Sequence, residues 1–421
     1  MIYDVVIIGT GPAGLGAAFH LIENNKSLKI LIVDKENICS GGLANDVKMN
    51  FTFPIGFPEE YWTKEEVDKL FPIIEKHLQP VFLNKTNIEI YQERARKVGS
   101  DLLSIKQAHV GTDKSKFLIK RLMKELEDLG VEIKLNTEMI AISPIENVII
   151  TDTNQDIYFK KLIIAPGRKG FSFLQKIMDD LKVDYIDNII DVGIRIETKL
   201  ESYPIVKDYY DPKFYFPNKV RTFCTNSGKA LVVKEKYKDF YLVNGHALSE
   251  ERKENNLVNF ALLKTIGLKN PVRSGQQMAV FLARLANEIG GGKPIMQRIG
   301  DFRMGKRSKE STFNNDLYDF KATCDACAGD LGLAVPSKIM RDLWSSMKIL
   351  DTIIPGILHP STIMYYPELK MYGNKPNFIN NHFQAKENIY MIGDGAGTSR
   401  GITGAWASGI KAAQDILEIN K

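Results

Sequence analysis

The first fourteen residues hold the pattern that most restricts how this chain can fold. A short apolar run, Tyr3–Ile8, leads without a gap into Gly9-Thr10-Gly11-Pro12-Ala13-Gly14, and helix-spaced apolar residues follow. A G-x-G-x-x-G segment is informative in this context, because strand, glycine turn and helix begin a nucleotide-binding βαβ unit. Gly9 permits the tight turn, Gly11 lets the backbone approach a pyrophosphate, and Gly14 lets helix and strand pack closely. We therefore predict a dinucleotide-binding site at the start of this helix.

The next segment supplies a candidate ribose ligand. A second predicted strand, Lys29–Val33, ends at Asp34, at about the 20-residue spacing where dinucleotide-binding folds place an acidic side chain. Its carboxylate can accept hydrogen bonds from ribose hydroxyls, while the helix N-terminus offers N–H groups and a positive dipole end to the phosphates. A polar loop with Gly41-Gly42 follows. We interpret it either as backbone close to the bound nucleotide or as a simple surface turn.

Composition excludes several classes of protein. The chain has 421 residues, which is enough for two domains of about 100–200 residues each. Its net charge of +5 is small, and no block of like charges forms a nucleic-acid tail. No apolar run approaches the roughly 20 residues that span a bilayer, and Met1 leads directly into the first strand, so we expect a cytoplasmic protein. Four cysteines are too few for a disulfide scaffold.

The order of predicted elements indicates an α/β fold that is interrupted by an insertion. Residues 64–126 are mostly helical in pattern, 131–159 resemble a small β-meander, and 161–164 form a buried-type strand. From 193 onward the chain is rich in alternating strands, and the earlier α/β character returns after about 344. We predict a split Rossmann-like domain with a parallel central sheet and a β-meander, made by 1–192 and 345–421. An inserted β-rich α+β substrate domain covers 193–344, with ligands bound at the carboxyl ends of the parallel strands, between the two domains.

A second glycine-rich segment follows a predicted strand near the C-terminus. Asn388–Ile392 leads into Gly393-Asp394-Gly395-Ala396-Gly397, and a helix with small residues at 404, 405 and 407–409 comes next. An acidic residue between glycines can hold polyol hydroxyls, as Asp34 would hold a ribose. The helix N-terminus can stabilise negative charge such as a reduced flavin carries at its N1–C2 edge. The small residues would let this helix pack very closely on a flat surface or a strand.

The order of these segments is similar to a known signature. Gly9–Gly14, Asp34, Ala165-Pro166-Gly167 and Gly393–Gly409 together resemble the two-site FAD signature of the glutathione-reductase-type flavoprotein superfamily. More narrowly, the chain resembles the uncharacterised FAD-dependent dehydrogenases related to flavoproteins with a split dinucleotide domain. The resemblance covers nearly the whole chain, because it extends to Gly41-Gly42 with Lys48, His109–Asp113, Val192–Arg195, Asn244–His246, Gly300–Arg303, Gly329-Asp330 and Ala334–Pro336.

The resemblance implies bound FAD but no particular reaction. It implies that the first glycine segment meets the pyrophosphate, Asp34 the adenosine ribose, and the backbone at Met139 the adenine. Asp394 would meet the ribityl or phosphate region, and Gly401–Thr403 the isoalloxazine edge. Asp34 departs from the Glu that is more frequent in FAD proteins. The full set expected to bind the cofactor is Gly9, Gly11, Pro12, Ala13, Gly14, Asp34, Lys35, Gly41, Gly42, Met139, Ala165, Gly167, Gly393, Asp394, Arg400, Gly401, Ile402 and Thr403.

The source of electrons is left open by the sequence. Disulfide reductases of the superfamily carry a second G-x-G-x-x-G/A segment for NAD(P)H, and nothing in 150–330 matches it. NAD(P)H, as a transient donor, must therefore bind without a dedicated Rossmann domain, or the electrons come from elsewhere.

Cys324-Asp325-Ala326-Cys327 is a candidate for redox chemistry. The C-x-x-C spacing suits a dithiol beside a flavin, or half of a zinc site. No paired Cys or His motif completes a zinc site, and we predict no metal. Two small buried residues before a tight turn are an equally good interpretation.

Several basic residues and one histidine are candidates for contact with substrate. Arg298, Arg303 and Arg307 crowd one short stretch, where guanidinium groups suit a carboxylate or phosphate, although a solvated basic loop has the same composition. Lys48 follows the Gly41-Gly42 loop, and Arg195 alternates with apolar residues, so on a buried face it needs a partner or an anionic ligand.

His246 follows Asn244-Gly245 after a strand. From there its imidazole can act as acid or base over the flavin, or bond to backbone as a structural histidine. We list His246, Arg303, Cys324 and Cys327 as catalytic candidates, and Lys48, Arg195, Arg298 and Arg307 as substrate-binding candidates.

The predicted function is an FAD-dependent oxidoreductase that moves a hydride or electron pair between the flavin and a small anionic substrate. One alternative is a flavin-linked thiol/disulfide reductase that uses Cys324 and Cys327, with a thiol/disulfide or electron-carrier protein as partner. A role as an RNA-modifying flavoprotein is a weaker alternative, because no basic stripe with interleaved aromatic residues is present. A flavin-binding scaffold without catalysis is also compatible with the fold. The sequence leaves the substrate, the direction of reaction and the oligomeric state open.

Overall fold

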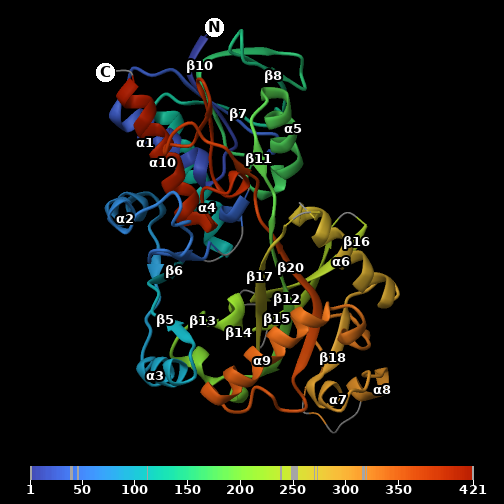
Figure 1. Cartoon of the computed structure of the whole chain (residues 1–421). Coiled ribbons are helices and arrows are strands. Elements are labelled where there is room, and N and C mark those ends of the chain that lie inside the picture. Colours follow the sequence, from blue (N-terminus) through green and yellow to red (C-terminus); the bar gives the residue numbers. More distant parts are fainter. Residues whose placement is uncertain are drawn as a thin grey trace. The chain divides into compact units, whose positions relative to one another are not determined.

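The structure, a computed structural model, describes residues 2–37, 41–44, 47–110, 112–237, 239–247, 255–269, 271–272, 274–314, 318 and 320–419. The chain divides into two units. The first unit comprises Met1–Leu83, Ile105–Asp187 and Tyr372–Lys421, and the second comprises Asn84–Ser104 and Asn188–Met371 (Figure 1). The expected insertion, 193–344, lies wholly within the second unit, which also includes 84–104, 188–192 and 345–371.

The first unit is built on a sheet whose strand order is β22-β23-β10-β1-β2-β7. Its neighbours β23, β10, β1, β2 and β7 all run parallel, which confirms the predicted parallel central sheet. Their bounds are β1 Ile2–Ile8, β2 Ile30–Val33, β7 Glu132–Lys134, β10 Asp156–Ile164, β22 Gln384–Lys386 and β23 Ile389–Met391.

The predicted meander is present as an antiparallel extension of this sheet. β8 (Met139–Ser143) pairs with β9 (Val148–Thr151), and β9 pairs with the start of β10. The segments 157–159 and 161–164, which the sequence pattern separates, form the single strand β10. Its first half alternates at the surface, and its second half, Leu162–Ile164, is fully buried, so the change in burial along one strand explains the two patterns.

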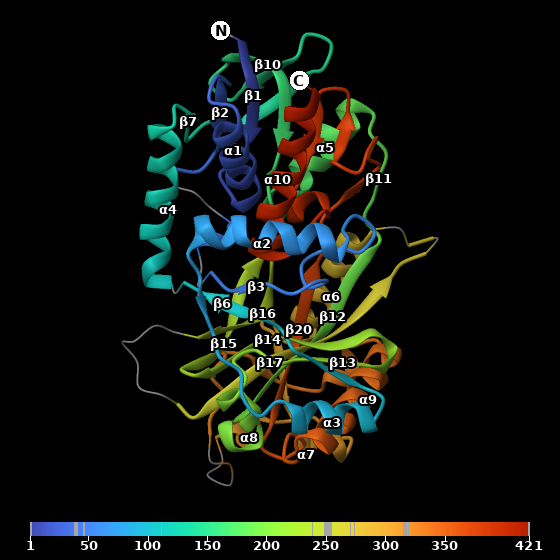
Figure 2. The same ribbon diagram turned by 90° about the vertical axis from the view of Figure 1, so that its left-hand side faces the viewer.

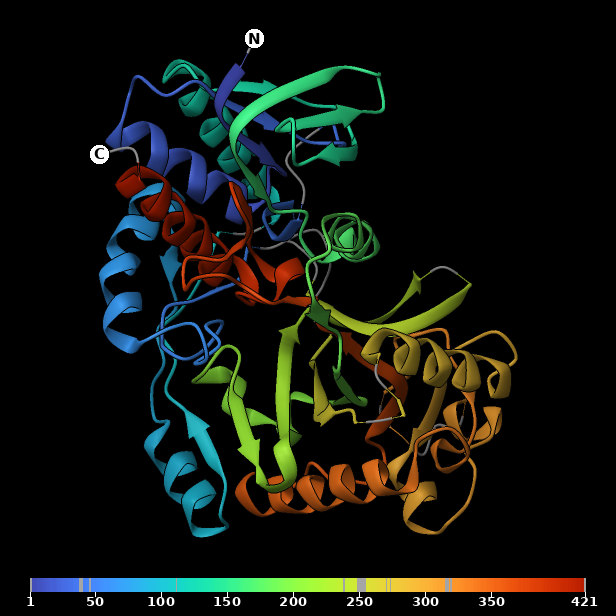
Figure 3. The same cartoon turned by 45° about the horizontal axis from the view of Figure 1, so that its top comes forward.

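Helices cover both faces of this sheet. α1 (Pro12–Asn24), α4 (Thr112–Asp128) and α10 (Gly401–Ile419) lie on one face, and α5 (Phe171–Leu181) on the other (Figures 1 and 3). The small residues of α10 pack against another helix, α1, rather than against a strand. A Cβ on Gly409 would lie 2.1 Å from the carbonyl oxygen of Ala13, and one on Gly16 would lie 2.4 Å from that of Trp406. Only glycine permits this closeness.

A helix and two small sheets complete the first unit. α2 (Lys64–Leu78) begins with a capping box, because Thr63 and Glu66 exchange hydrogen bonds. The strands of the small sheets are β3 (Met49–Asn50), β4 (Val81–Phe82) and β6 (Gln107–His109), and β11 (Tyr185–Ile186) with β21 (Lys375–Pro376).

The second unit contains a sheet with strand order β19-β18-β20-β12-β17-β14-β13-β5. The bounds are β5 Asp101–Leu103, β12 Ile189–Lys199, β13 Lys213–Phe216, β14 Val220–Gly228, β17 Leu257–Gly267, β18 Ile295–Arg298, β19 Cys327–Ala328 and β20 Ile363–Met371. A separate hairpin is formed by β15 (Ala230–Tyr237) and β16 (Phe240–Ala247), and Figure 2 shows the strands of this unit. Its helices are α3 (Glu89–Lys97), α6 (Gly275–Ile289), α7 (Ile299–Arg303), α8 (Glu310–Phe313) and α9 (Ser337–Ile353).

The central strand β12 divides its side chains by chemistry. Val192, Ile194 and Ile196 alternate with Asp191, Arg195 and Glu197, and all of them are buried. Since successive side chains of a strand point to opposite faces, one face of β12 is apolar and the other is charged. A buried charged face needs partners, and this face carries the polar network described below.

Among the described residues, no helix is both long and apolar enough to cross a membrane.

Candidate functional site

A cavity of about 400 Å³ in the first unit brings together the two glycine segments. It lies where β1, β2 and β10 end, because Ile8, Val33 and Ala165 line it. Ligands of open α/β sheets bind at this edge, outside the carboxyl ends of the strands. Gly9–Ala13 and Gly393–Asp394, which are far apart in sequence, line the same space.

Most residues expected to bind the cofactor line this cavity. All do so except Gly14, Gly41, Arg400 and Thr403. Gly14 packs closely against the backbone of the turn, since a Cβ there would lie 1.9 Å from the carbonyl oxygen of Gly9. The cavity is also lined by residues outside the predicted cofactor-binding set: Ile8, Val33, Glu36, Ala44, Thr137, Glu138, Pro166, Arg168, Lys169, Gly170, Phe173 and Ala405. Most of them are close sequence neighbours of predicted residues, but Phe173 lies on α5 and carried no signal.

The glycine turn has the geometry that a pyrophosphate site requires. Gly9 has a φ of +108°, and a Cβ there would lie 2.4 Å from the carbonyl oxygen of Ala165, so only glycine fits. A Cβ on Gly11, in contrast, would meet nothing within 4 Å, which leaves its backbone open to the cavity. Gly11 is the N-cap of α1, and no side chain of the described residues caps that end. The N–H groups of the first turn therefore remain for an anionic ligand.

Asp34 connects this turn to the strand beside it. Its Oδ2 accepts hydrogen bonds from the amide nitrogen of Thr10 at 2.7 Å and from the Thr10 hydroxyl at 2.6 Å, and its Oδ1 accepts one from the amide nitrogen of Glu36 at 2.9 Å. A carboxylate has about four acceptor positions, so Asp34 can still receive a hydroxyl from a ligand. The side chain of Asp34 is shorter than that of Glu, and Thr10 contacts it through both its amide nitrogen and its hydroxyl.

Asp394 occupies the equivalent place in the second glycine segment. Its carboxylate accepts hydrogen bonds from the Ser399 hydroxyl and from the amide nitrogen of Gly401, both at 2.9 Å. The second bond caps the first residue of α10. The Nε of Arg168 lies 3.7 Å from Oδ2 of Asp394. Burial raises the pKa of Asp394 above its usual range, and the charge of Arg168 opposes this. The arrangement presents a buried carboxyl group and a helix N-terminus to one cavity.

The residues of this cavity fit FAD on three observations. A helix N-terminus without a side-chain cap lies beside Gly11, an acidic residue follows the end of β2, and a second glycine segment with its own helix lines the same cavity. With a second glycine segment, the cavity can contact a longer part of a dinucleotide than a single nucleotide-binding motif can.

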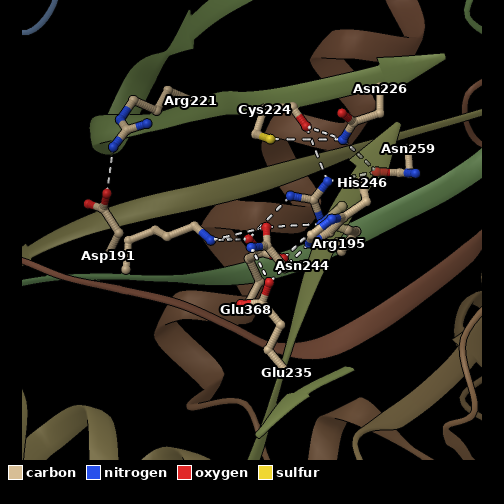
Figure 4. A network of polar contacts seen from close by, with 12 residues as sticks. Asp191, Arg195, Arg221, Cys224, Asn226, Glu235, Asn244, His246, Asn259 and Glu368 are labelled. Carbon is tan, nitrogen blue, oxygen red and sulfur yellow. Dashed lines mark hydrogen bonds and ion pairs between the residues drawn. The ribbon is translucent and has the colours of Figure 1, made fainter. Parts of the chain in front are cut away.

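Arg195, a substrate-binding candidate, is wholly buried in the second unit (Figure 4). Its Nε donates to Glu368 at 2.9 Å and its Nη2 to the same carboxylate at 3.3 Å. Its Nη1 donates to the side chain of Asn259 at 2.7 Å and to the carbonyl oxygen of Cys224 at 3.1 Å. The guanidinium is therefore engaged by groups of the protein itself.

Arg298 is also wholly buried. It donates to the carbonyl oxygens of Ser361 and Phe320, and its guanidinium lies 4.2 Å from the centroid of the Tyr318 ring. Burial lowers its pKa. Arg303, at the end of α7, and Arg307 are exposed, and Lys48 in the first unit is partly exposed.

The C-x-x-C segment forms a turn that leads into β19. Cys324 is 6% exposed, and burial raises the pKa of its thiol to about 12, so it stays protonated at neutral pH. Cys327 is partly exposed and donates its thiol proton to the carbonyl oxygen of Ala328 at 3.6 Å. Between them, Asp325 pairs with Lys293 at 2.6 Å and with Lys234, and its hydrogen bonds to these lysines lower its pKa to about 2.

No group of three or more metal-binding side chains occurs in the part of the chain that the structure describes. Cys39 and Gly111 lie outside the described residues.

His246 lies at the end of β16 and is about half exposed, at 49%. Its Nε2 is 3.0 Å from Oε1 of Glu235, which the sequence analysis missed (Figure 4). No sequence signal indicated this partner, because Glu235 lies opposite Leu242 and His246 lies opposite Leu231, so the two residues share a face of the hairpin without being a direct cross-strand pair. Asn244 donates to the same carboxylate oxygen at 3.1 Å.

Comparison with known proteins yields distant likenesses. No family model matches the chain. An uncharacterized protein of Clostridium beijerinckii is 23% identical over an alignment of 460 positions that covers 98% of this chain and 80% of that protein. An uncharacterized protein of Methanosarcina barkeri is 40% identical over an alignment of 70 positions that covers 15% of this chain and 18% of that protein.

Solved structures with similar topology include an L-proline dehydrogenase from P. horikoshii, with a TM-score of 0.42, 11% identity and coverage of 99% of this chain and 93% of that one. A glycine oxidase from Bacillus cereus has a TM-score of 0.39 and 14% identity, with coverage of 100% and 96%. A flavoprotein/dehydrogenase from Cytophaga hutchinsonii has a TM-score of 0.40 and 13% identity, with coverage of 100% and 79%. All three scores are below 0.5, so we base the fold and the site on this chain's own residues.

Proposed function

We propose that this protein is an FAD-dependent oxidoreductase. The observation that carries the proposal is the cavity in the first unit, where two glycine segments from opposite ends of the chain line one space at the carboxyl edge of a parallel sheet. When bound, FAD would accept or donate a hydride or an electron pair, and the protein would supply binding, orientation and proton transfer.

The residues present suit the parts of FAD in a consistent order. Gly9 and Gly11 with the start of α1 would hold the pyrophosphate, and Asp34 the adenosine ribose. The backbone at Met139 would hold the adenine. Asp394 would bind the ribityl or phosphate region, and Gly401–Thr403 the isoalloxazine edge, where the N-terminus of α10 would stabilise negative charge.

The nature of the substrate is less constrained. The guanidinium of Arg195 is engaged by groups of the second unit, whereas that of Arg298 is wholly buried there and has no hydrogen-bond partner for its Nε among the described residues. Of the basic residues predicted to bind an anionic substrate, Lys48, Arg303 and Arg307 keep exposed surface and stay candidates. The buried, protonated thiol of Cys324 gives the thiol/disulfide reductase no support. NAD(P)H is proposed as the electron donor to test first.

A pair of glycine variants tests the cofactor site. Neither Gly11 nor Gly267 has an atom within 4 Å of an added Cβ, and neither has a positive φ, so both alanine variants should fold. The methyl group of Gly11→Ala would project into the space next to the pyrophosphate, whereas that of Gly267→Ala lies on β17 in the second unit. We expect wild type and Gly267→Ala to take up FAD and show a flavin absorbance band, and Gly11→Ala to bind it at least tenfold more weakly.

An anaerobic titration of the loaded protein with NADH, NADPH and then dithionite completes the test. Bleaching by a nicotinamide identifies the electron donor, and bleaching by dithionite alone points to a different one. Absence of a flavin band in wild type after incubation with FAD would refute the proposal, and so would equal FAD binding by Gly11→Ala and wild type.

A further inference from the structure

One basic side chain in the cavity of the first unit is held close to an acidic group without being bonded to it. Arg168 lines this cavity, and its side chain is 64% exposed. Among the described residues, Asp394 supplies the one carboxylate within ion-pair distance of it. Nε of Arg168 lies 3.7 Å from Oδ2 of Asp394, which is too long for a hydrogen bond. The donors of the guanidinium therefore remain available to a ligand.

Backbone contacts place Arg168 next to the second glycine segment and near the start of α1. A Cβ on Gly395 would lie 2.4 Å from the carbonyl oxygen of Gly167, the residue before Arg168. A Cβ on Gly393 would lie 3.0 Å from that of Ala13, in the first turn of α1. The second glycine segment thus contacts both the first turn of α1 and the residue that precedes Arg168.

The side chains that line the cavity are, on balance, acidic. Four carboxylates and three basic groups line it: Asp34, Glu36, Glu138 and Asp394, and Lys35, Arg168 and Lys169. The diphosphate of FAD would bring further negative charge into this space. Since like charges at short range repel each other, a cation is needed wherever the diphosphate passes an acidic side chain.

This requirement is greatest at Asp394, which the proposed function places at the ribityl or phosphate region. Its carboxylate is fixed by the Ser399 hydroxyl and the amide nitrogen of Gly401, both at 2.9 Å, so it is not free to turn away from a phosphate. The charge of Arg168 already opposes the effect of burial on the pKa of Asp394. A guanidinium carries five N–H donors in a planar fork, so Arg168 can serve this carboxylate and a phosphate together.

The other basic side chains of this region are placed differently. Arg400 does not line the cavity, because its guanidinium lies 4.1 Å from the centroid of the Tyr372 ring and donates to the hydroxyl of that residue at 3.3 Å. Lys35 lies in the part of the cavity beside β2, where its Nζ is 3.7 Å from Glu138. Lys169 lines the cavity but forms no ion pair with any described residue.

We propose that Arg168 binds the phosphate of FAD that is attached to the ribityl chain, and that it bridges this phosphate and Asp394; this deepens the function proposed above and rests on it. The contact is a charge-assisted hydrogen bond, which is stronger than a neutral one. It adds a cofactor-binding side chain to a site that otherwise relies on backbone N–H groups and helix N-termini.

Phosphorus NMR of the FAD-loaded protein tests the contact itself. FAD has one phosphorus on the ribityl side and one on the adenosine side, and ¹⁷O labelling of either one identifies its resonance. In Arg168→Gln at saturating FAD, we expect the ribityl-side resonance to shift and the adenosine-side resonance to stay in place. Equal shifts of both, a shift of the adenosine-side resonance alone, or no shift would overturn the proposal. A shift of the ribityl-side resonance in Lys169→Gln but not in Arg168→Gln would overturn it as well.

The affinity for FAD supplies a second readout. We expect Arg168→Gln to bind FAD about 10–100-fold more weakly than wild type at low ionic strength, as for loss of a hydrogen bond to a charged group. Arg168→Lys, which keeps the charge without the fork, should recover part of the loss. Since Arg168 is exposed, the difference between wild type and Arg168→Gln should shrink as NaCl is added.

Lys160→Gln is the matched control for the loss of one positive charge. Lys160 lies on β10, its side chain is 68% exposed beside Asp4, and it does not line the cavity, so its replacement should leave FAD affinity and both phosphorus resonances unchanged. Equal FAD affinity of Arg168→Gln and wild type would contradict the role of Arg168 and leave the proposed oxidoreductase function standing. Failure of the wild type to bind FAD would instead refute that function itself.

Discussion

The buried ion pair of Arg195 and Glu368 should respond unequally to removal of its two partners. Both side chains are 0% exposed, and Nε of Arg195 lies 2.9 Å from Oε2 of Glu368. Glu368 has a second cationic partner, since Nζ of Lys370 lies 2.7 Å from its Oε1. Arg195, in contrast, has no carboxylate other than Glu368 among its hydrogen bonds, which go to Asn259 and a carbonyl oxygen. Glu368→Gln would leave two cations facing each other without an anion, whereas Arg195→Met would leave Glu368 paired with Lys370.

The magnitudes follow from this asymmetry. Breaking a buried pair so that one charge is left uncompensated costs about 3–5 kcal/mol. We expect Glu368→Gln to fall in this range, and Arg195→Met to cost about half as much. At roughly 2–4 °C per kcal/mol for a unit of this size, Glu368→Gln should lower the Tm of the second unit by about 10 °C. A double replacement with apolar residues should recover part of the loss, because no charge then remains buried without a partner.

Fluorescence reports on the second unit selectively. Trp344 on α9 belongs to the second unit, whereas Trp62 and Trp406 belong to the first. Thermal and urea unfolding would be followed in Trp62→Phe/Trp406→Phe protein. Glu201→Gln is the matched control, since Glu201 is 76% exposed beside Lys199 and its loss should change stability by less than about 0.5 kcal/mol. If Arg195→Met were as destabilising as Glu368→Gln, then Lys370 would not compensate the charge of Glu368, and the reasoning would be refuted.

Three further predictions concern single residues. His77 is buried between Phe19 and Trp406, and burial lowers its pKa, so the unfolded chain binds a proton at His77 more readily than the folded chain does. The wild type should therefore lose unfolding free energy as the pH falls below about 6.5. Urea unfolding of His77→Leu should show a smaller loss over the same pH range. Native Cys324 should resist iodoacetamide while Cys327 reacts, as mass spectrometry of timed samples would show, and prompt labelling of Cys324 would refute its burial. Thr63→Ala should lower the unfolding free energy by about 1 kcal/mol through loss of the capping box, and an unchanged urea midpoint would show that the cap contributes nothing.

The cavity beside the first glycine segment was predictable because the sequence rules that produce it are local. A turn that needs a φ of +108° at Gly9, a helix that starts at Pro12 and an acidic residue at the end of the next strand are each visible within a few residues. The parallel sheet follows from the same pattern, since strands joined by helices pair in parallel. These features require no knowledge of distant segments.

The polar network of the second unit was not predictable for the opposite reason. Arg195 alternates with apolar residues, which showed that it needs a partner, but Glu368 lies 173 positions away on β20. The pairing of β12 with β20 shifts between Gly193 and Arg195, so even a correct pairing of the strands would have given the wrong register. The strand Ile363–Met371 lies within 345–421, which the sequence analysis assigned to the first domain, whereas the structure includes it in the second unit.

The places where the chain leaves and re-enters the first unit explain how a split nucleotide-binding unit can hold together. The chain leaves after Leu83 and returns at Ile105, and β4 and β6, on either side of this excursion, pair antiparallel. It leaves again after Asp187 and returns at Tyr372, and β11 pairs there with β21 in the same way. Each excursion is thus closed by strands of the first unit. The residues between them therefore add only the entropy cost of closing a loop, which grows slowly with the length of the loop.

A truncated chain should therefore fold by itself. We expect that replacing 84–104 and 188–371 with short Gly/Ser linkers yields a protein that still binds FAD, because the cavity lining lies wholly outside the removed segments. Gly11→Ala in the truncated chain should bind FAD at least tenfold more weakly than the truncated wild type, as in the full chain. Removing β4 (81–82) and β21 (375–376), which are one strand from each of the two pairs, should prevent folding. The ends of each linker would then no longer be held together. A truncated chain that is unfolded by circular dichroism in the presence of FAD would show that the second unit contributes to the nucleotide-binding fold more than two closed loops.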